Sequence, residues 1–174
     1  MHRSAHRRVR GFNVVELVIV LMIIGILVAL AIPGYRDNRR RANMTEVVLA
    51  TSPCRMAVSD GWLREQASPG AGNWGCEHAA PTTRFVGRVQ TTENGEIRVQ
   101  VRNLASNLDG LFVYLKPYET AVPATSGGGV FEPGQAVRSW RCGVANSDVA
   151  SQALMQVLPS TCRDLIDMAG VWAP

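Results

Sequence analysis

The feature that most constrains this chain is an apolar run from Val14 to Ile32, in which Glu16 is the only charged residue. At about 1.5 Å of rise per residue, a helix of this length nearly crosses a hydrocarbon core about 30 Å thick. A carboxylate costs about 2.5–3.5 kcal/mol at the centre of such a helix, and less near the interface. We therefore interpret Glu16 as a functional residue that needs a cationic partner.

The segment before this run is basic. Met1–Arg10 contains four arginines and no acid, so it is expected to stay cytoplasmic and to direct everything after Pro33 to the outside. A basic segment followed by an apolar run also fits a secretory signal, and Ala29-Leu30-Ala31 offers a small-x-small cleavage site. Against this alternative, Glu16 interrupts the run, which is also longer than the usual 7–15 residues.

Around the run, the sequence resembles the type IV pilins, and in particular the precursors of bacterial type IVa major pilins. The resemblance rests on Gly11, on Phe12, on Glu16 as the fifth residue after the glycine, and on the I-I-G-I-L-x-A-x-A-I-P-x-Y pattern of Ile23–Tyr35. It implies cleavage after Gly11 by a prepilin peptidase, N-methylation of Phe12, and assembly of the helix into a filament core. There, Glu16 would pair with the amino group of Phe12 on a neighbouring subunit.

The helix is expected to continue well beyond the apolar run. Between Met44 and Val58 apolar residues recur at helical spacing on one side, which predicts a single helix from near Phe12 to about Trp62. Pro53 removes one backbone hydrogen bond and is expected to kink this helix. Gly25 and Pro33 also weaken it, and the pilin resemblance makes them places where it bends or locally melts.

A sheet is expected after the helix. Residues 68–83 are rich in Gly, Pro, Ser and Ala and predict a long loop. In residues 85–90 and 97–102 apolar and polar positions alternate, with Phe85, Gly87 and Val89 on one face of the first strand. Asn94-Gly95 between these strands is a strong hairpin signal. Residues 111–115 and 137–142 are two further candidate strands, so we predict an antiparallel sheet with one face on the helix and one facing outward.

The predicted fold class is therefore α+β: a long N-terminal helix, half of it hydrophobic and protruding, packed on a four-stranded antiparallel sheet, with a disulfide-closed C-terminal loop. The chain divides into a leader (1–11), a membrane or filament-core helix (12–35), the second half of the helix (36–66), a helix-to-sheet loop (67–83), the sheet (84–142), and a C-terminal loop and tail (143–174). The apolar tail from Asp164 onward is expected to dock at a place that the sequence does not define.

Four cysteines in an exported domain predict two disulfides, for which three connectivities are open. The segments W-x-C at Trp140–Cys142 and L-P-x-x-C-R at Leu158–Arg163 resemble the C-terminal loop of type IVa pilins. This resemblance favours a Cys142–Cys162 disulfide and leaves Cys54 to pair with Cys76. The sequence has no C-x-x-C spacing and only one histidine outside the leader, so we predict no metal site.

Charge and motifs argue against several other functions. Without the four leader arginines the chain carries 14 basic and 14 acidic residues. Arginines 84, 88, 98 and 102 lie on the predicted hairpin, but strand alternation exposes such residues in any case, so the nucleic-acid signal is not strong. The sequence contains no phosphate-binding glycine loop, H-E-x-x-H or G-x-S-x-G motif. His78 is the one histidine outside the leader, and we predict neither an enzyme nor a cofactor.

The resemblance implies a structural subunit that polymerises into a fibre for adhesion, twitching motility and DNA uptake. Its expected partners are further copies of the chain, the prepilin peptidase, and the inner-membrane assembly platform with its motor. Its expected location is the inner membrane of a Gram-negative bacterium, and then the extracellular fibre. A minor pilin, including one that captures DNA, and a pseudopilin of a type II secretion system are alternatives. A pseudopilin usually lacks the cysteine-closed loop, which argues against that alternative. The last alternative is a soluble domain released after Ala31.

Overall fold

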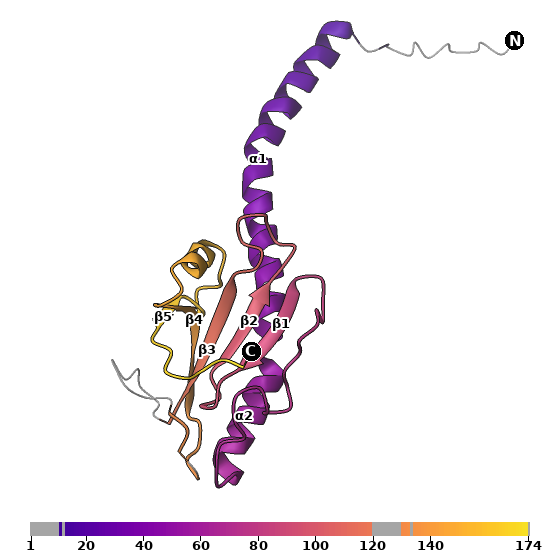
Figure 1. Ribbon diagram of the computed structural model, residues 1–174. Coiled ribbons are helices and arrows are strands. Elements are labelled where there is room, and N and C mark those ends of the chain that lie inside the picture. The colour runs from indigo at the N-terminus through magenta and orange to yellow at the C-terminus, as the bar shows by residue number, and fades with distance from the viewer. Residues whose placement is uncertain (1–10, 12, 120–129, 133, 174) are drawn as a thin grey trace, which may run out of the picture. The chain divides into compact units, whose positions relative to one another are not determined.

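The computed structural model describes residues 11, 13–119, 130–132 and 134–173 (Figure 1). It forms two units, residues 1–38 and 39–174, and the boundary between them falls inside α1. The leader and Phe12, which the sequence marks for cleavage and methylation, lie outside the described residues. The elements are α1 (Val14–Leu49), α2 (Ser52–Arg64), β1 (Val86–Thr91), β2 (Ile97–Val101), β3 (Phe112–Tyr118), β4 (Ser139–Ala145), the 3-10 helix η1 (Ala150–Gln156) and β5 (Asp164–Ile166).

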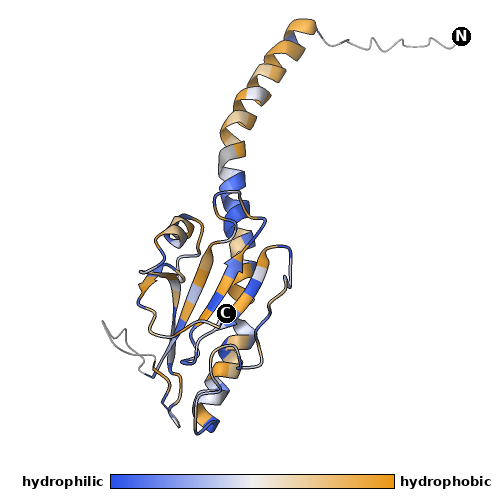
Figure 2. Cartoon of the chain, viewed as in Figure 1, coloured by the Kyte–Doolittle hydropathy of each residue, from blue (hydrophilic) through white to orange (hydrophobic). Residues whose placement is uncertain are grey.

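The first unit is the N-terminal part of α1. Asn13 caps it: its side-chain oxygen accepts a hydrogen bond from the Val15 amide at 3.3 Å, and its carbonyl accepts one from the Leu17 amide at 3.2 Å. The helix then runs through Gly25 and Pro33 without interruption. Figure 2 shows that its residues are hydrophobic almost throughout, as expected for a segment that is covered by lipid or by other helices.

The predicted long helix is present from Val14 to Arg64, and the kink expected at Pro53 takes the form of a short break. α1 ends at Leu49 and α2 begins at Ser52, with Pro53 in the first turn of α2. Proline has no amide hydrogen, and its ring collides with the carbonyl four residues earlier, which here belongs to Leu49. The chain therefore starts a new helix at the position where proline is tolerated. At this break the Thr51 hydroxyl donates a hydrogen bond of 2.7 Å to the carbonyl oxygen of Val48.

The sheet has five strands in the order β1-β2-β3-β4-β5. The four predicted strands are present and pair antiparallel, and the β1–β2 turn contains Asn94-Gly95, with Gly95 at φ 77°. The fifth strand was not predicted. β5 pairs parallel to β4, beginning with Gly143 opposite Asp164. A three-residue strand is too short to show alternation, so the sequence pattern could not reveal it.

A β-bulge changes which residues of β1 face the helix. The pairing with β2 shifts between Val86 and Val89, and both of these valines are buried in the core. The expectation that Phe85, Gly87 and Val89 share one face was therefore wrong, because the extra residue in a bulge reverses the alternation. Arg88 consequently lies on the opposite face, over the ring of Phe112.

The main core lies between the helices and one face of the sheet. The helices contribute a buried stripe that includes Met44, Val47, Cys54, Val58 and Trp62, all of them fully buried. This is the stripe expected from the sequence, extended by one turn to Trp62. The sheet contributes alternate residues of its strands: Ile97, Val99, Val101, Val113, Leu115 and Val144.

The second face of the sheet does not simply face outward. A smaller cluster around Tyr114, Ala145 and Ile166 packs there with Met168 and Trp172 of the C-terminal segment. Figure 1 shows this segment, in yellow, crossing in front of the strands from β5 toward the C-terminus. Near the end of this segment, Trp172 pairs with Thr92 in an isolated antiparallel β-bridge. The apolar tail thus docks on the face of the sheet that the sequence pattern left open.

Candidate functional site

The first candidate site is the start of α1. Glu16 is in the first helical turn, three residues after the cap Asn13, and its side chain is exposed. A carboxylate at this position interacts favourably with the helix dipole by about 0.3–1 kcal/mol. Among the described residues no hydrogen bond or ion pair engages the Glu16 side chain. The structure therefore gives Glu16 a local role in starting the helix and leaves its carboxylate free for another molecule.

The apolar side chains on both sides of Glu16 are also without cover in the single chain. Val14 is 74% exposed, Leu21 58% and Leu30 75%. The helix is the one among the described residues that is long and apolar enough to cross a membrane, with a mean hydropathy of 3.1 over its most apolar stretch. Such a surface is stable only when lipid or other protein chains cover it.

Two glycines near this segment have no role within the single chain. A Cβ atom added to Gly11 or to Gly25 would meet no atom within 4 Å. Neither has a positive φ, so the backbone does not require glycine at either position. Neither the packing nor the backbone conformation of the single chain therefore accounts for glycine at these two positions.

The second candidate site is the pair of disulfides in the sheet-bearing unit. Cys54 of α2 is bonded to Cys76 in the loop that follows the helix, and Cys142 of β4 is bonded to Cys162. The Cys142–Cys162 prediction is thus confirmed, and the structure also joins the other two cysteines. Each bond closes a loop of about 20 residues, which corresponds to about 3 kcal/mol in the chain-entropy model.

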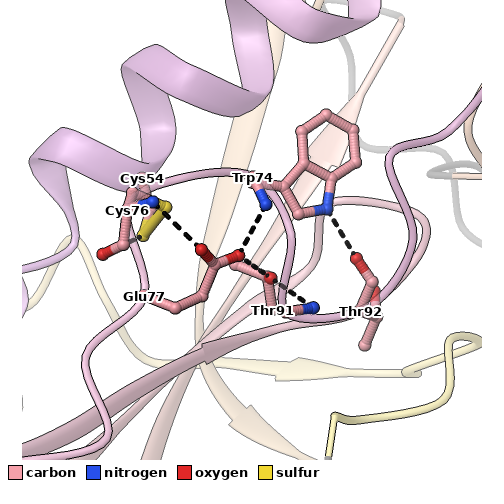
Figure 3. The surroundings of a disulfide bond; sticks show 7 residues. Cys54, Trp74, Cys76, Glu77, Thr91 and Thr92 are labelled. Atoms are coloured by element: carbon pink, nitrogen blue, oxygen red, sulfur yellow. Dashed lines mark hydrogen bonds between the residues drawn. A yellow bond between two sulfur atoms is a disulfide. The ribbon is translucent and has the colours of Figure 1, made fainter.

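Glu77 supports the loop around the first disulfide (Figure 3). Its carboxylate accepts hydrogen bonds from the backbone amides of Trp74 at 2.9 Å and Cys76 at 3.0 Å, and from the hydroxyl of Thr91. Burial alone would raise the pKa of Glu77, but these hydrogen bonds outweigh burial and hold the pKa below its ordinary value. An ionised Glu77 therefore fixes the loop to β1.

The second disulfide holds the start of β5 against β4. Immediately after Cys142, a Cβ atom added to Gly143 would lie 1.9 Å from the backbone oxygen of Asp164. No side chain fits at this position, because the backbone of β5 occupies the space. Arg141 also reaches the side chain of Asp164, with 3.0 Å between Nε and Oδ2. The disulfide and the glycine together set the register of the last strand.

A buried ion pair holds the rest of the C-terminal segment. Glu96 is fully buried, and its two oxygens accept hydrogen bonds from the amides of Ala169 and Gly170, each at 2.9 Å. The amine of Lys116 lies 3.4 Å from Glu96 Oε1 and donates to the carbonyl of Asp167 at 2.7 Å. We call these contacts the tail clasp, defined by Glu96, Lys116 and residues 167–170.

Sequence reasoning missed the tail clasp, although one signal pointed to it. Lys116 is the only lysine of the chain, and it interrupts the apolar strand F-V-Y-L-K-P-Y. A charged residue in the middle of such a strand indicates a buried partner, because an unpaired buried charge is very costly. The sequence did not indicate that this partner is Glu96, nor that the pair would bind the backbone of the tail.

Arginines and aromatic rings alternate next to the tail clasp. The guanidinium of Arg98 lies 4.7 Å from the ring centre of Phe112 and 4.5 Å from that of Trp172. Tyr114 donates a hydrogen bond to Asp148 at 2.7 Å, and burial together with this carboxylate raises the pKa of Tyr114. Of the predicted basic residues of the hairpin, Arg98 is therefore held within the fold by two aromatic rings.

Comparison with known proteins places these features in a family. A family model described as Pilin (bacterial filament) matches residues 40–163. A fimbrial protein of Neisseria meningitidis serogroup B is 31% identical over 91% of this chain and 96% of its own length. A type IV major pilin protein PilE1 of Neisseria gonorrhoeae is 27% identical over 91% of this chain and 96% of its own. Fimbrial protein Q of Moraxella bovis is 31% identical over 94% of this chain and 83% of its own.

An exposed apolar helix followed by a disulfide-closed α+β unit defines a subunit built to polymerise. The chain belongs to the type IV pilin family. It is accordingly a structural protein of a pilus and not an enzyme. Within the described residues, no group of three or more His, Cys, Asp or Glu side chains is arranged to hold a metal ion.

Proposed function

We propose that this chain is the precursor of a major pilin, cleaved after Gly11, methylated at Phe12, and polymerised through α1 into an extracellular fibre. The observation that supports this most is the uncovered apolar surface of α1 in the single chain. Before assembly the inner membrane would cover it, and in the fibre the helices of neighbouring copies would do so. Two of the relatives compared above carry fimbrial protein names, and one is named a major pilin.

In this proposal Glu16 guides assembly. The free amine of Phe12 in an incoming subunit would be the cation that pairs with the unpartnered carboxylate of Glu16 in a neighbour. At a separation of about 4 Å and an effective dielectric constant near 20, the two charges attract by about 4 kcal/mol. This exceeds the cost of about 2.5–3.5 kcal/mol of placing a carboxylate in the membrane. The pair would also select one axial register between adjacent helices.

The proposed partners follow from these steps. A prepilin peptidase would act at Gly11, and an inner-membrane platform with its motor would extend and retract the fibre, since the chain has no nucleotide-binding motif. The disulfide-closed segment between Cys142 and Cys162 favours a pilin over a type II secretion pseudopilin. Surface adhesion and twitching motility are the uses that we propose for the fibre. Gly25, Pro33 and Pro53 would supply its bending points.

The test is the mass and N-terminal sequence of material sheared from cells that express the chain. We expect abundant fibres whose subunit starts at N-methylated Phe12. A subunit that starts at Ile32 would contradict the proposal and favour a cleaved secretory signal. Gly11→Leu should leave the uncleaved precursor in the membrane, whereas Gly34→Leu, at a second exposed glycine of the same unit, should not affect cleavage.

A further inference from the structure

We propose that the pocket between Arg88 and Arg102 on the sheet binds an organic carboxylate of the size of a sugar acid. This inference does not depend on the proposed pilus function, because it concerns a surface cavity of the sheet-bearing unit alone. The cavity has a volume of about 420 Å³, within the range of small-molecule sites. It is lined by Ala79, Pro81, Gly87, Arg88, Gln100, Val101, Arg102 and Gly110.

The pocket owes its shape to the β-bulge of β1. The bulge lies between Val86 and Val89 and turns Arg88 to the face opposite the core. Bulges commonly redirect a side chain in this way next to binding sites. Gly87, the other residue inside the bulge, leaves the floor open. A Cβ atom there would lie 3.0 Å from the side-chain oxygen of Gln100, so even alanine would crowd the cavity.

The charge in the pocket is not neutralised by the protein. Among the described residues, no hydrogen bond or ion pair engages the side chains of Arg88 and Arg102, and Arg88 Nε is buried without an acceptor. No acidic residue lines the cavity. Glu77 lines the adjoining cavity, which shares Arg88, but its two oxygens are already engaged by Trp74, Cys76 and Thr91.

A second arginine makes an external anion more favourable. Arg88 and Arg98 both lie over the ring of Phe112, at 5.4 and 4.7 Å from its centre. Arg98 already has Gln90 Oε1 as an acceptor at 2.9 Å, whereas Arg88 has no such partner. An anion bound at Arg88 would therefore reduce repulsion between two cations on one face. Guanidinium groups bind carboxylates with paired, charge-assisted hydrogen bonds.

The remaining walls indicate an organic ligand and not a bare inorganic ion. Ala79 and Pro81 provide apolar surface, and the Gln100 amide, which donates to the Gly110 carbonyl at 3.2 Å, provides a polar group at the rim. A sugar acid matches this arrangement: its carboxylate meets the arginines, its hydroxyls meet the amide, and the C–H face of its ring covers the apolar wall. A sulfate ion would fill only part of the cavity.

The experiment is isothermal titration calorimetry of the full chain in detergent micelles at low salt. The probes are glucuronate, its neutral amide, and inorganic sulfate. We expect glucuronate to bind, its amide to bind at least tenfold more weakly, and sulfate to bind more weakly than glucuronate. Arg88→Gln and Arg102→Gln should each weaken glucuronate binding about tenfold, because each removes one charge-assisted contact.

Two further variants separate the pocket from general charge effects. Gly87→Ala leaves the net charge unchanged but crowds Gln100, and it should also weaken glucuronate binding. Arg64→Gln removes the same charge from α2, outside the pocket, and should leave binding unchanged. The proposal is overturned if glucuronate does not bind, if its amide binds equally well, if sulfate binds more tightly, or if Arg64→Gln weakens binding as much as Arg88→Gln.

Discussion

The tail clasp offers the sharpest test of how this fold is held together. Lys116→Met would remove the amine that lies 3.4 Å from Glu96 Oε1, at a place where the two side chains are 5% and 0% exposed. Glu96 would keep its hydrogen bonds to the amides of Ala169 and Gly170 but would remain a buried, uncompensated charge. Breaking a buried ion pair in this way costs about 3–5 kcal/mol, and we expect a loss of unfolding free energy in that range.

The matched control is an exposed ion pair on α2. Arg64 and Asp60 form it with 2.5 Å between Nε and Oδ1, and their side chains are 74% and 61% exposed. Arg64→Met removes the same charge but leaves Asp60 in contact with water. Exposed pairs of this kind contribute about 0–1 kcal/mol. The two methionine variants should therefore differ in unfolding free energy by at least about 2 kcal/mol.

The assay is denaturant unfolding of the full chain in detergent, followed by tryptophan fluorescence. The chain has four tryptophans, with Trp172 in the C-terminal segment and Trp62 in the main core, so variants in which one of these two is the sole tryptophan would separate release of the tail from global unfolding. Lys116→Met should release Trp172 at lower denaturant than Trp62. If Lys116→Met costs no more than Arg64→Met, the clasp does not stabilise the fold and our reasoning about its burial is wrong.

Three further predictions concern other parts of the chain. Glu16→Val should be cleaved and folded normally yet give few fibres by electron microscopy. Glu16→Gln, which keeps the size and polarity of the side chain but not its charge, should fail equally, and normal fibres from it would rule out the charge pair with Phe12. Cys142→Ser should lower the unfolding free energy by about 2–5 kcal/mol and reduce surface fibres, and an unchanged denaturation midpoint would contradict this. Because the pKa of Glu77 lies below its ordinary 4.5, its ionised form stabilises the fold above that pH, and the contribution is lost as pH falls through the lowered pKa. Glu77→Gln should therefore make stability less dependent on pH in the acid range, and an unchanged acid midpoint would count against this role.

Much of the fold was predictable from local sequence patterns. The apolar run, the one-sided stripe from Met44 to Val58, and the alternation in residues 97–101 each report a regular element. The Asn94-Gly95 turn was equally clear, since Gly95 takes a φ of 77° and a Cβ atom there would lie 2.5 Å from Val58. These signals are local, so a single sequence carries them in full.

The features that sequence reasoning missed depend on contacts between distant segments. The bulge at Gly87–Arg88 appears only when β1 is paired with β2. β5 is three residues long and lies next to Cys162, whose disulfide with Cys142 joins it to β4. The tail clasp joins residues 51 to 74 positions apart. Nothing in the local pattern of either partner specifies such a pairing, although the isolated Lys116 indicated that some partner exists.

At the start of α1 the residue pattern points to contacts with other molecules. Gly11 and Glu16 have no packing role within the chain, and Phe12 lies outside the described residues. Their proposed roles depend on molecules that act on the chain or assemble with it. In such a case the pattern of residues is more informative than the fold, because the contacts that explain it are intermolecular.

The burial of Lys116 has a practical consequence for anyone who handles this protein. Because it is the only lysine, the folded chain offers reagents no accessible amine other than its N-terminus. Aldehyde fixatives, succinimidyl dyes and amine-coupled sensor surfaces all depend on such amines, so they should react poorly with the folded subunit. Fluorescent labelling would have to use carboxylates or an introduced cysteine. For the same reason, a lysine introduced on the surface by mutation would be labelled almost selectively by amine-reactive reagents.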